Sequence, residues 1–131
     1  MQKILLVEDD ESIRDLYKRQ LALAGFSVET ASTGQEGLAL AQKNKYDLLI
    51  LDIMLPDVNG VEILKRIRKE QGVNKDTVTI FLTNLGQEDV VREGLMQGAI
   101  AYLIKAQYTP DQIVAEVKNF LSQASLKPSQ P

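Results

Sequence analysis

The sequence predicts an α/β fold in which a parallel β-sheet is covered by helices on both faces. Short apolar runs alternate along the chain with stretches of helical periodicity, a pattern typical of repeated βα units. Several runs are continuously apolar, as strands buried on both faces of a sheet must be. With 131 residues, of which 44% are hydrophobic, the chain is expected to form one domain with an ordinary core.

Five apolar runs are predicted as strands, and the first, third and fourth are the most continuously apolar. In chain order the predicted strands are Ile4–Val7, Phe26–Thr30, Leu48–Leu51, Val78–Leu82 and Ile100–Ile104. All five are short, as strands of a small α/β domain usually are.

Apolar residues between the strands recur at helical spacing and predict the inner faces of helices. One predicted face carries Ile13, Leu16, Tyr17, Leu21 and Ala24, and another carries Val61, Leu64 and Ile67. Two further helices open near Gly34 and near Gln87, although Gly37 and Gly94 lie inside them. The last helix begins at Thr109 and Pro110, which suit a cap and a first turn. Its apolar stripe is Ile113, Val114, Val117, Phe120 and Leu121. Five βα repeats result.

After Leu121 the composition changes to Ser, Gln, Lys and Pro, which cannot bury apolar surface. We therefore predict a domain over residues 1–121 and a flexible tail, or the start of a linker, over residues 122–131. This composition leaves open whether the chain is a whole protein or part of a longer one.

The overall charge argues against direct nucleic-acid binding. The net charge is −3, whereas contact with a phosphate backbone needs a concentrated basic surface. The basic cluster Lys65, Arg66, Arg68 and Lys69 is flanked by acids and is interpreted as a solvated helix face.

The chain contains neither Cys nor His. Disulfides, Ser/His/Asp triads and the usual zinc sites are thereby excluded. The apolar run near the N-terminus is shorter than the core of a signal peptide, and no run approaches the length that spans a bilayer. A cytoplasmic protein that does not enter the membrane is expected.

Chemically distinctive residues stand where the predicted strands end. Glu8, Asp9 and Asp10 follow the first strand, and Asp52, Thr83 and Lys105 end the third, fourth and fifth. In an open parallel sheet, ligands bind beyond the carboxyl ends of the strands. Taken singly, the acids after the first strand could simply cap a helix, but Asp52 follows a buried run and needs a partner for its charge.

These groups suit phosphoryl transfer to a carboxylate. Crowded carboxylates repel one another unless a hard cation lies among them, and few oxygen ligands completed by water suit Mg²⁺. We expect Mg²⁺ to bridge Asp9, Asp52 and the phosphoryl group. Lys105 is expected to supply further positive charge and Thr83 a hydrogen bond to the phosphoryl oxygens. Asp52 is then the nucleophile.

Four segments resemble the marker segments of bacterial response regulator receiver domains, in the right order. They are ILLVEDD at 4–10, LDIMLPDVNG at 51–60, FLT at 81–83 and YLIK at 102–105. The resemblance extends from Lys3 to about Leu121, and the chain is similar to receivers of the chemotaxis type. It implies a flavodoxin-like (βα)5 domain with strand order 2-1-3-4-5.

The resemblance also implies roles for individual residues. Asp52 accepts the phosphoryl group, Asp9 is a direct Mg²⁺ ligand, Glu8 acts through water, and the Met54 carbonyl completes the metal shell. Thr83, Tyr102 and Lys105 form the switch. The domain is thus expected to be a regulatory phosphoacceptor that catalyses only its own phosphorylation and dephosphorylation.

The partners implied are a histidine kinase or phosphotransfer protein as phosphodonor, and a downstream protein or effector domain. A phosphorylation-dependent homodimer is also compatible with the family. The cognate kinase, output partner and oligomeric state are not given by the sequence.

The sequence departs from the family pattern after two of these residues. Ala106 follows Lys105 where the family usually has a cis proline, and a cis bond before a non-proline residue costs roughly 2.5 to 4 kcal/mol. Asn84 follows Thr83 where the family prefers a small residue.

Met54 and Leu85 are expected to flank the path of the attacking water without orienting it, which predicts slow self-dephosphorylation.

Two other classes of protein fit these residues less well than a receiver domain does. A phosphatase with an aspartate nucleophile typically needs a second acid two residues later, where this chain has Met54. A flavodoxin-like cofactor binder needs Gly, Ser or Thr backbone donors after the first strand rather than three acids.

Overall fold

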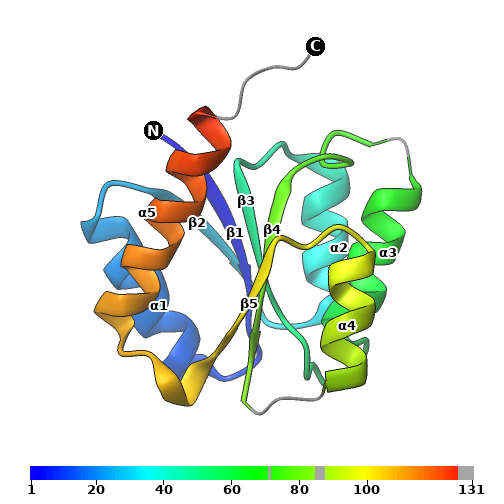
Figure 1. Cartoon of the computed structure of the whole chain (residues 1–131), viewed down its shortest axis with the longest axis horizontal. Helices are drawn as coiled ribbons and strands as arrows, with labels where there is room; N and C mark the ends of the chain where they lie inside the picture. Colours follow the sequence, from blue (N-terminus) through cyan, green and yellow to red (C-terminus); the bar gives the residue numbers. More distant parts are fainter. Residues whose placement is uncertain (71, 85–87, 127–131) are drawn as a thin grey trace.

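The computed structural model of the chain describes residues 1–70, 72–84 and 88–126 (Figure 1). Within these ranges, five parallel strands form one sheet in the order β2-β1-β3-β4-β5, which confirms the predicted topology. The strands are β1 Lys3–Val7, β2 Ser27–Ala31, β3 Leu48–Asp52, β4 Val78–Thr83 and β5 Ala101–Ile104. Each begins and ends within one residue of its predicted bounds.

The helices described are α1 Glu11–Leu23, α2 Gly34–Lys43, α3 Gly60–Lys69, α4 Glu88–Met96 and α5 Pro110–Leu126, with a 3₁₀ turn η1 at Lys105–Gln107. The predicted helix start at Gln87 lies outside the described residues. Thr109 caps α5 as predicted, since its hydroxyl accepts from the Gln112 N–H and its own N–H donates to the Gln112 side chain. In the part of the chain described, no helix is long and apolar enough to cross a membrane.

Helix α5 continues beyond Leu121, where the sequence predicted a tail, and ends at Leu126. Ser122 to Leu126 contains no Pro or Gly, and its Ala and Leu favour a helix. Polar composition therefore did not stop the helix. The domain boundary itself stays a prediction, and residues 127–131 lie outside the described residues.

The sheet separates two apolar layers, with α1 and α5 on one face and α2, α3 and α4 on the other (Figure 1). Strand β1 shows how one strand serves both, because successive side chains point to opposite faces. Ile4 and Leu6 pack with the α1 and α5 side, whereas Leu5 and Val7 pack with the α2 and α3 side. The continuously apolar strands are therefore buried on both faces, as predicted.

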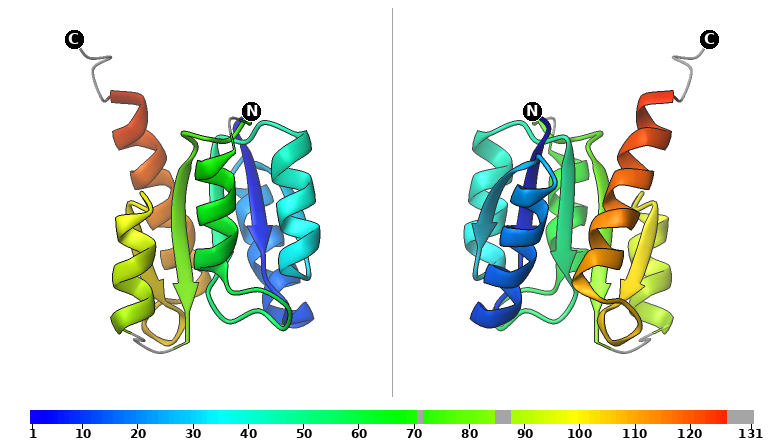
Figure 2. Two further views of the ribbon diagram at one scale, coloured as in Figure 1. Left: turned by 90° about the vertical axis from the view of Figure 1, so that its right-hand side faces the viewer. Right: turned by 90° about the vertical axis from the view of Figure 1, so that its left-hand side faces the viewer.

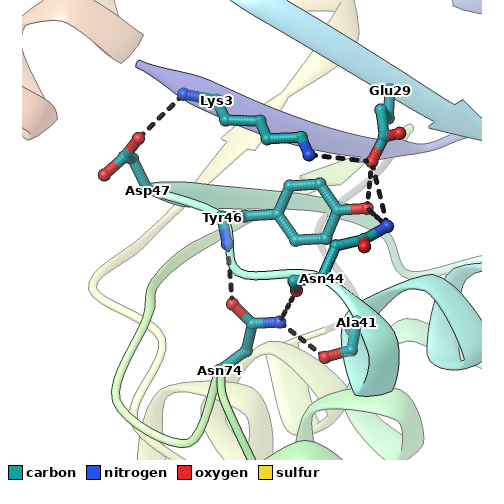
Figure 3. Close-up of polar contacts among 7 residues, drawn as sticks. All are labelled: Lys3, Glu29, Ala41, Asn44, Tyr46, Asp47 and Asn74. Atoms are coloured by element: carbon teal, nitrogen blue, oxygen red, sulfur yellow. Dashed lines mark hydrogen bonds and ion pairs between the residues drawn. The ribbon is translucent and has the colours of Figure 1, made fainter. Parts of the chain in front are cut away.

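A network of hydrogen bonds and ion pairs lies at the amino end of the sheet (Figure 3). The Tyr46 hydroxyl donates to Glu29, and the Lys3 ammonium lies 3.7 Å from Glu29 and 5.4 Å from the centre of the Tyr46 ring. The Asn74 side chain donates to the carbonyls of Ala41 and Asn44 and accepts from the Tyr46 N–H. Burial and the bond to Glu29 raise the pKa of Tyr46 to about 12. These contacts hold the loops at the end remote from the predicted site.

Candidate functional site

The carboxyl ends of the strands point to the end of the sheet opposite the N-terminus (Figure 2). Glu8 directly follows β1, Asp52 is the last residue of β3, and Lys105 follows β5 at the start of η1. Because β1 and β5 flank β3 and β4 in one parallel sheet, residues far apart in the chain meet at this edge. The structure thus brings together Glu8, Asp52 and Lys105, three of the groups that the strand ends predicted, whereas Asp10 caps α1.

Lys105 joins the two buried carboxylates. Its ammonium Nζ lies 2.7 Å from Glu8 Oε1 and 3.0 Å from Asp52 Oδ2. The relative exposure is 0% for Glu8 and 1% for Asp52, and only 8% for the Lys105 side chain. Two carboxylates therefore share one ammonium in a place that water scarcely reaches, which leaves an excess of negative charge.

The electrostatics of Asp52 follow from this crowding. Burial, together with the neighbouring Glu8 carboxylate, raises the pKa of Asp52 to about 7, although Lys105 and the Met54 N–H oppose the rise. Met54 donates its N–H to Asp52 Oδ1 at 3.1 Å. Burial alone would lower the pKa of Lys105, but its bonds to Glu8 and Asp52 outweigh burial and the net pKa is raised. Without a further cation, ionisation of Asp52 is thus less favourable in the folded protein than in the unfolded chain.

A metal ion fits this site. Glu8, Asp9 and Asp52 each offer a carboxylate oxygen, and the three atoms lie within 4.8 Å of one another. Asp9 is exposed, so its carboxylate lies on the solvent side of the group. Oxygen donors with an open side suit Mg²⁺, which keeps part of its water shell. The Met54 carbonyl remains a predicted ligand.

The predicted switch residues Thr83 and Tyr102 lie in different environments. Thr83 ends β4 and is buried at 1% exposure, whereas Tyr102 on β5 is 42% exposed. Asn84 is exposed. No cis peptide occurs among the described residues, so the Lys105–Ala106 bond is trans, and η1 forms where the family pattern places a proline. Leu85 lies outside the described residues.

Gly60 and Asp57 stood in the recognised motif but were assigned no role. A Cβ atom at Gly60 would overlap the carbonyl oxygen of Asp52, so the close approach of α3 to the end of β3 requires glycine. Asp57 accepts hydrogen bonds from the N–H groups of Gly34 at 2.8 Å and Gln35 at 2.9 Å, which lower its pKa. The loop after Asp52 is thereby fastened to the start of α2.

The basic cluster on α3 is only partly the solvated face that was predicted. Lys65 pairs with Glu93 at 3.0 Å and Arg66 with Glu62 at 3.3 Å, both at exposed positions. Arg68 is different, because its half-buried guanidinium donates to backbone carbonyls of neighbouring segments. Helical spacing gave no sign of this, since Arg68 lies next to the buried stripe and its acceptors lie outside α3.

Comparisons with known proteins agree with this geometry. A model of the response regulator receiver domain family matches residues 4–118. The transcriptional regulatory protein SrrA of Staphylococcus aureus (strain NCTC 8325 / PS 47) is 37% identical over 119 residues, which make up 91% of this chain and 47% of SrrA. The chain therefore spans about half the length of this curated relative.

Two solved structures show that the similarity extends to the fold. A CheY-like receiver domain protein from Methanospirillum hungatei JF-1 is 30% identical, with a TM-score of 0.89 over 98% of this chain and 99% of that one. Chemotaxis protein CheY4 of Vibrio cholerae is 35% identical, with a TM-score of 0.83 over 91% of this chain and 98% of that one. Both similarities extend over nearly the whole chain.

Proposed function

The chain belongs to the receiver domain family of two-component response regulators, and we propose that it is a Mg²⁺-dependent switch phosphorylated on Asp52. The observation that carries the proposal is the position of Asp52, which is buried at a strand end between Lys105 and two other acids. Burying a charged carboxylate in an acidic group is costly, and a purely structural role gives no reason for it.

In the proposed reaction a carboxylate oxygen of Asp52 forms a bond to the phosphorus of the donor. The bond from phosphorus to the donor nitrogen or oxygen breaks, and the leaving group takes the bonding pair. Lys105, already within 3.0 Å of Asp52, is placed to donate to an oxygen of the arriving group. Thr83, at the end of the neighbouring strand, supplies a hydroxyl. When bound, Mg²⁺ supplies positive charge that offsets repulsion between the carboxylates and the phosphoryl oxygens.

Loss of the phosphoryl group requires a water molecule in line with the bond to Asp52. The Met54 side chain, 52% exposed beside the site, has only a thioether and cannot orient that water well. We therefore keep the prediction that the phosphorylated state decays slowly. The domain acts as a regulatory phosphoacceptor, and any catalysis concerns its own phosphorylation and dephosphorylation.

The proposed donors are a histidine kinase, a phosphotransfer protein or a small phosphodonor, and the proposed output is contact with a protein partner or effector domain. SrrA is a transcriptional regulator, and DNA in a bacterium lies in the cytoplasm, which supports a cytoplasmic location for this chain as well. Direct binding of this domain to nucleic acid is not proposed, because its net charge is −3.

Acetyl phosphate with Mg²⁺ is expected to produce a phosphorylated band in phosphate-affinity electrophoresis. The band should be absent after chelation and in Asp52→Asn, because the nucleophile is then missing. Asp89→Asn, which changes a fully exposed aspartate on α4, is the matched control and should behave as the parent does. A shifted band that persists in Asp52→Asn would overturn the assignment.

Phosphorylation is also expected to change the surface formed by α4, β5 and α5. The phosphoryl oxygens supply acceptors that favour movement of Thr83 toward Asp52, and this allows Tyr102 to turn inward from its exposed position. Leu95 and Met96 at the end of α4 and Ile100 just before β5 are also exposed, and we expect them to contact a partner or a second copy. Amide shifts caused by beryllofluoride should extend from Asp52 to Tyr102 and Asp111. Shifts confined to the pocket would contradict the switch.

A further inference from the structure

Arg14 on α1 contacts the acidic turn from behind. Its Nη1 donates to the backbone carbonyl of Glu8 at 3.0 Å and lies 3.4 Å from the carbonyl of Asp9. The side chain is partly buried, unlike that of Arg19 on the same helix, which is exposed. Arg14 therefore bonds to the main chain of two predicted metal-binding residues rather than to their carboxylates.

The rest of the turn is held by bonds of the same local kind. The Glu8 N–H donates to the Ala31 carbonyl at 3.0 Å, and the Asp10 N–H donates to Glu8 Oε2 at 3.1 Å. Asp10 in turn caps α1 by accepting from the Ile13 N–H at 3.0 Å. The carbonyls of Glu8 and Asp9 belong to the two peptide units that flank the Asp9 Cα. Arg14 therefore restrains the backbone on both sides of Asp9.

Asp9 has most to gain from a fixed backbone. It is exposed, whereas Glu8 and Asp52 are held by burial and by Lys105. An exposed carboxylate loses conformational freedom when it binds a cation, and a backbone that is already oriented reduces that loss. Four consecutive acids, residues 8–11, also repel one another, which favours an open turn in the absence of a restraint.

We propose that Arg14 is a positioning residue for the divalent cation: it holds the turn between β1 and α1 so that Asp9 faces the site beside Glu8 and Asp52. This inference rests on the proposed function, since it assigns Mg²⁺ to the three carboxylates. Arg14 does not touch the metal, and it acts only through the main chain of its ligands.

Two effects of Arg14 on cation binding have opposite signs. Its positive charge repels Mg²⁺, whereas its hydrogen bonds preorganise the ligands. Raising the salt concentration from about 0.01 M to about 1 M shortens the Debye length from about 30 Å to about 3 Å, which screens the first effect and leaves the second nearly unchanged. The difference between low and high salt therefore separates positioning from charge.

The test is calorimetric titration of the whole chain with Mg²⁺ at two salt concentrations. Arg14→Ala should bind Mg²⁺ about threefold to tenfold more weakly than the parent, the range expected from losing one or two hydrogen bonds to ligand residues. The loss should be greater at high salt, where charge repulsion no longer offsets it. Arg14→Lys keeps the charge and one donor and should recover part of the affinity. Arg19→Ala is the control and should bind as the parent does.

Equal affinity of Arg14→Ala and the parent at high salt would overturn the inference, and so would tighter binding at both salt concentrations. An equal loss in Arg19→Ala, which removes a charge from α1 without touching the turn, would also overturn the inference, because the loss could not then come from the hydrogen bonds of Arg14. Thermal unfolding without Mg²⁺ checks the fold of each variant, and if Arg14→Ala does not fold, the intermediate affinity required of Arg14→Lys decides. A parent chain that binds no Mg²⁺ would instead refute the proposed function.

Discussion

Asp52→Asn is expected to stabilise the metal-free protein at about pH 8, although it removes the proposed phosphoacceptor. Two buried carboxylates share the Lys105 ammonium, and burial with the Glu8 charge raises the pKa of Asp52 to about 7. Asparagine has nearly the same shape and leaves Glu8 and Lys105 as a balanced pair. A shift of that size, discounted for the lost bond to Lys105, predicts a gain of roughly 2 to 4 kcal/mol in the free energy of unfolding.

The pH dependence of this gain follows from the sign of the shift. The pKa of Asp52 is 3.8 in the unfolded chain and about 7 in the folded one, so the folded state binds the extra proton between these values. The parent should lose stability from this group as the pH rises from about 4 to about 7, and no more above that. The advantage of Asp52→Asn should therefore be small near pH 4 and full at about pH 8.

Urea unfolding followed by circular dichroism measures this prediction in the presence of a chelator, with Asp89→Asn as the control. Saturating Mg²⁺ should narrow the gap, because the cation stabilises the folded parent through the carboxylate that the variant lacks. A variant less stable than the parent at about pH 8 without metal would show that Lys105 fully compensates both acids. There would then be no trade-off between function and stability at Asp52.

The fold could be predicted to a large extent because its signals are local. Strand β3 is continuously apolar up to Asp52, and a sheet covered on both faces buries such a run. The end of α5 could not be placed, because Ser122 to Leu126 is polar enough to resemble a tail and yet contains nothing that stops a helix. Polarity indicates exposure, and an exposed segment can still be helical.

The site could be predicted in part for a related reason. A parallel sheet brings its strand ends together, so Glu8, Asp52 and Lys105 could be grouped without knowing any distance. The sequence did not show that Lys105 bonds to both acids, nor that Arg14 holds the turn behind them. Such contacts depend on where a long side chain ends. Helical spacing specifies a face, but it does not specify which carbonyls lie beside that face.

Arg68 illustrates the same limit and gives the largest destabilisation that we expect. Its Nη1 and Nη2 donate to the carbonyls of Lys75 and Thr77, both at 2.9 Å. Its Nε donates to the Gln97 carbonyl at 3.3 Å, just beyond the end of α4. One guanidinium therefore joins α3 to the loop before β4 and to the turn before β5. Gly98 approaches it closely, since a Cβ there would lie 3.2 Å from Arg68 Nε.

Arg68→Ala is expected to lower the free energy of unfolding by roughly 2 to 4 kcal/mol, because several partly buried carbonyls lose their donor at once. Burial lowers the pKa of Arg68, which shows that desolvation of the guanidinium offsets part of the stability that its hydrogen bonds give the parent. Arg68→Lys keeps the charge but not the planar fork, and it should recover no more than about half of the loss.

Arg66→Ala is the matched control, because Arg66 lies two positions earlier on α3 and pairs with Glu62 at 52% and 43% side-chain exposure. An exposed pair of this kind contributes less than about 1 kcal/mol. Urea unfolding should separate the two alanine variants clearly, and hydrogen exchange should be faster at the turn between α4 and β5 in Arg68→Ala alone. If both variants unfold at the same urea concentration, water replaces the guanidinium at these carbonyls, and Arg68 is then no more than another solvated cation of α3.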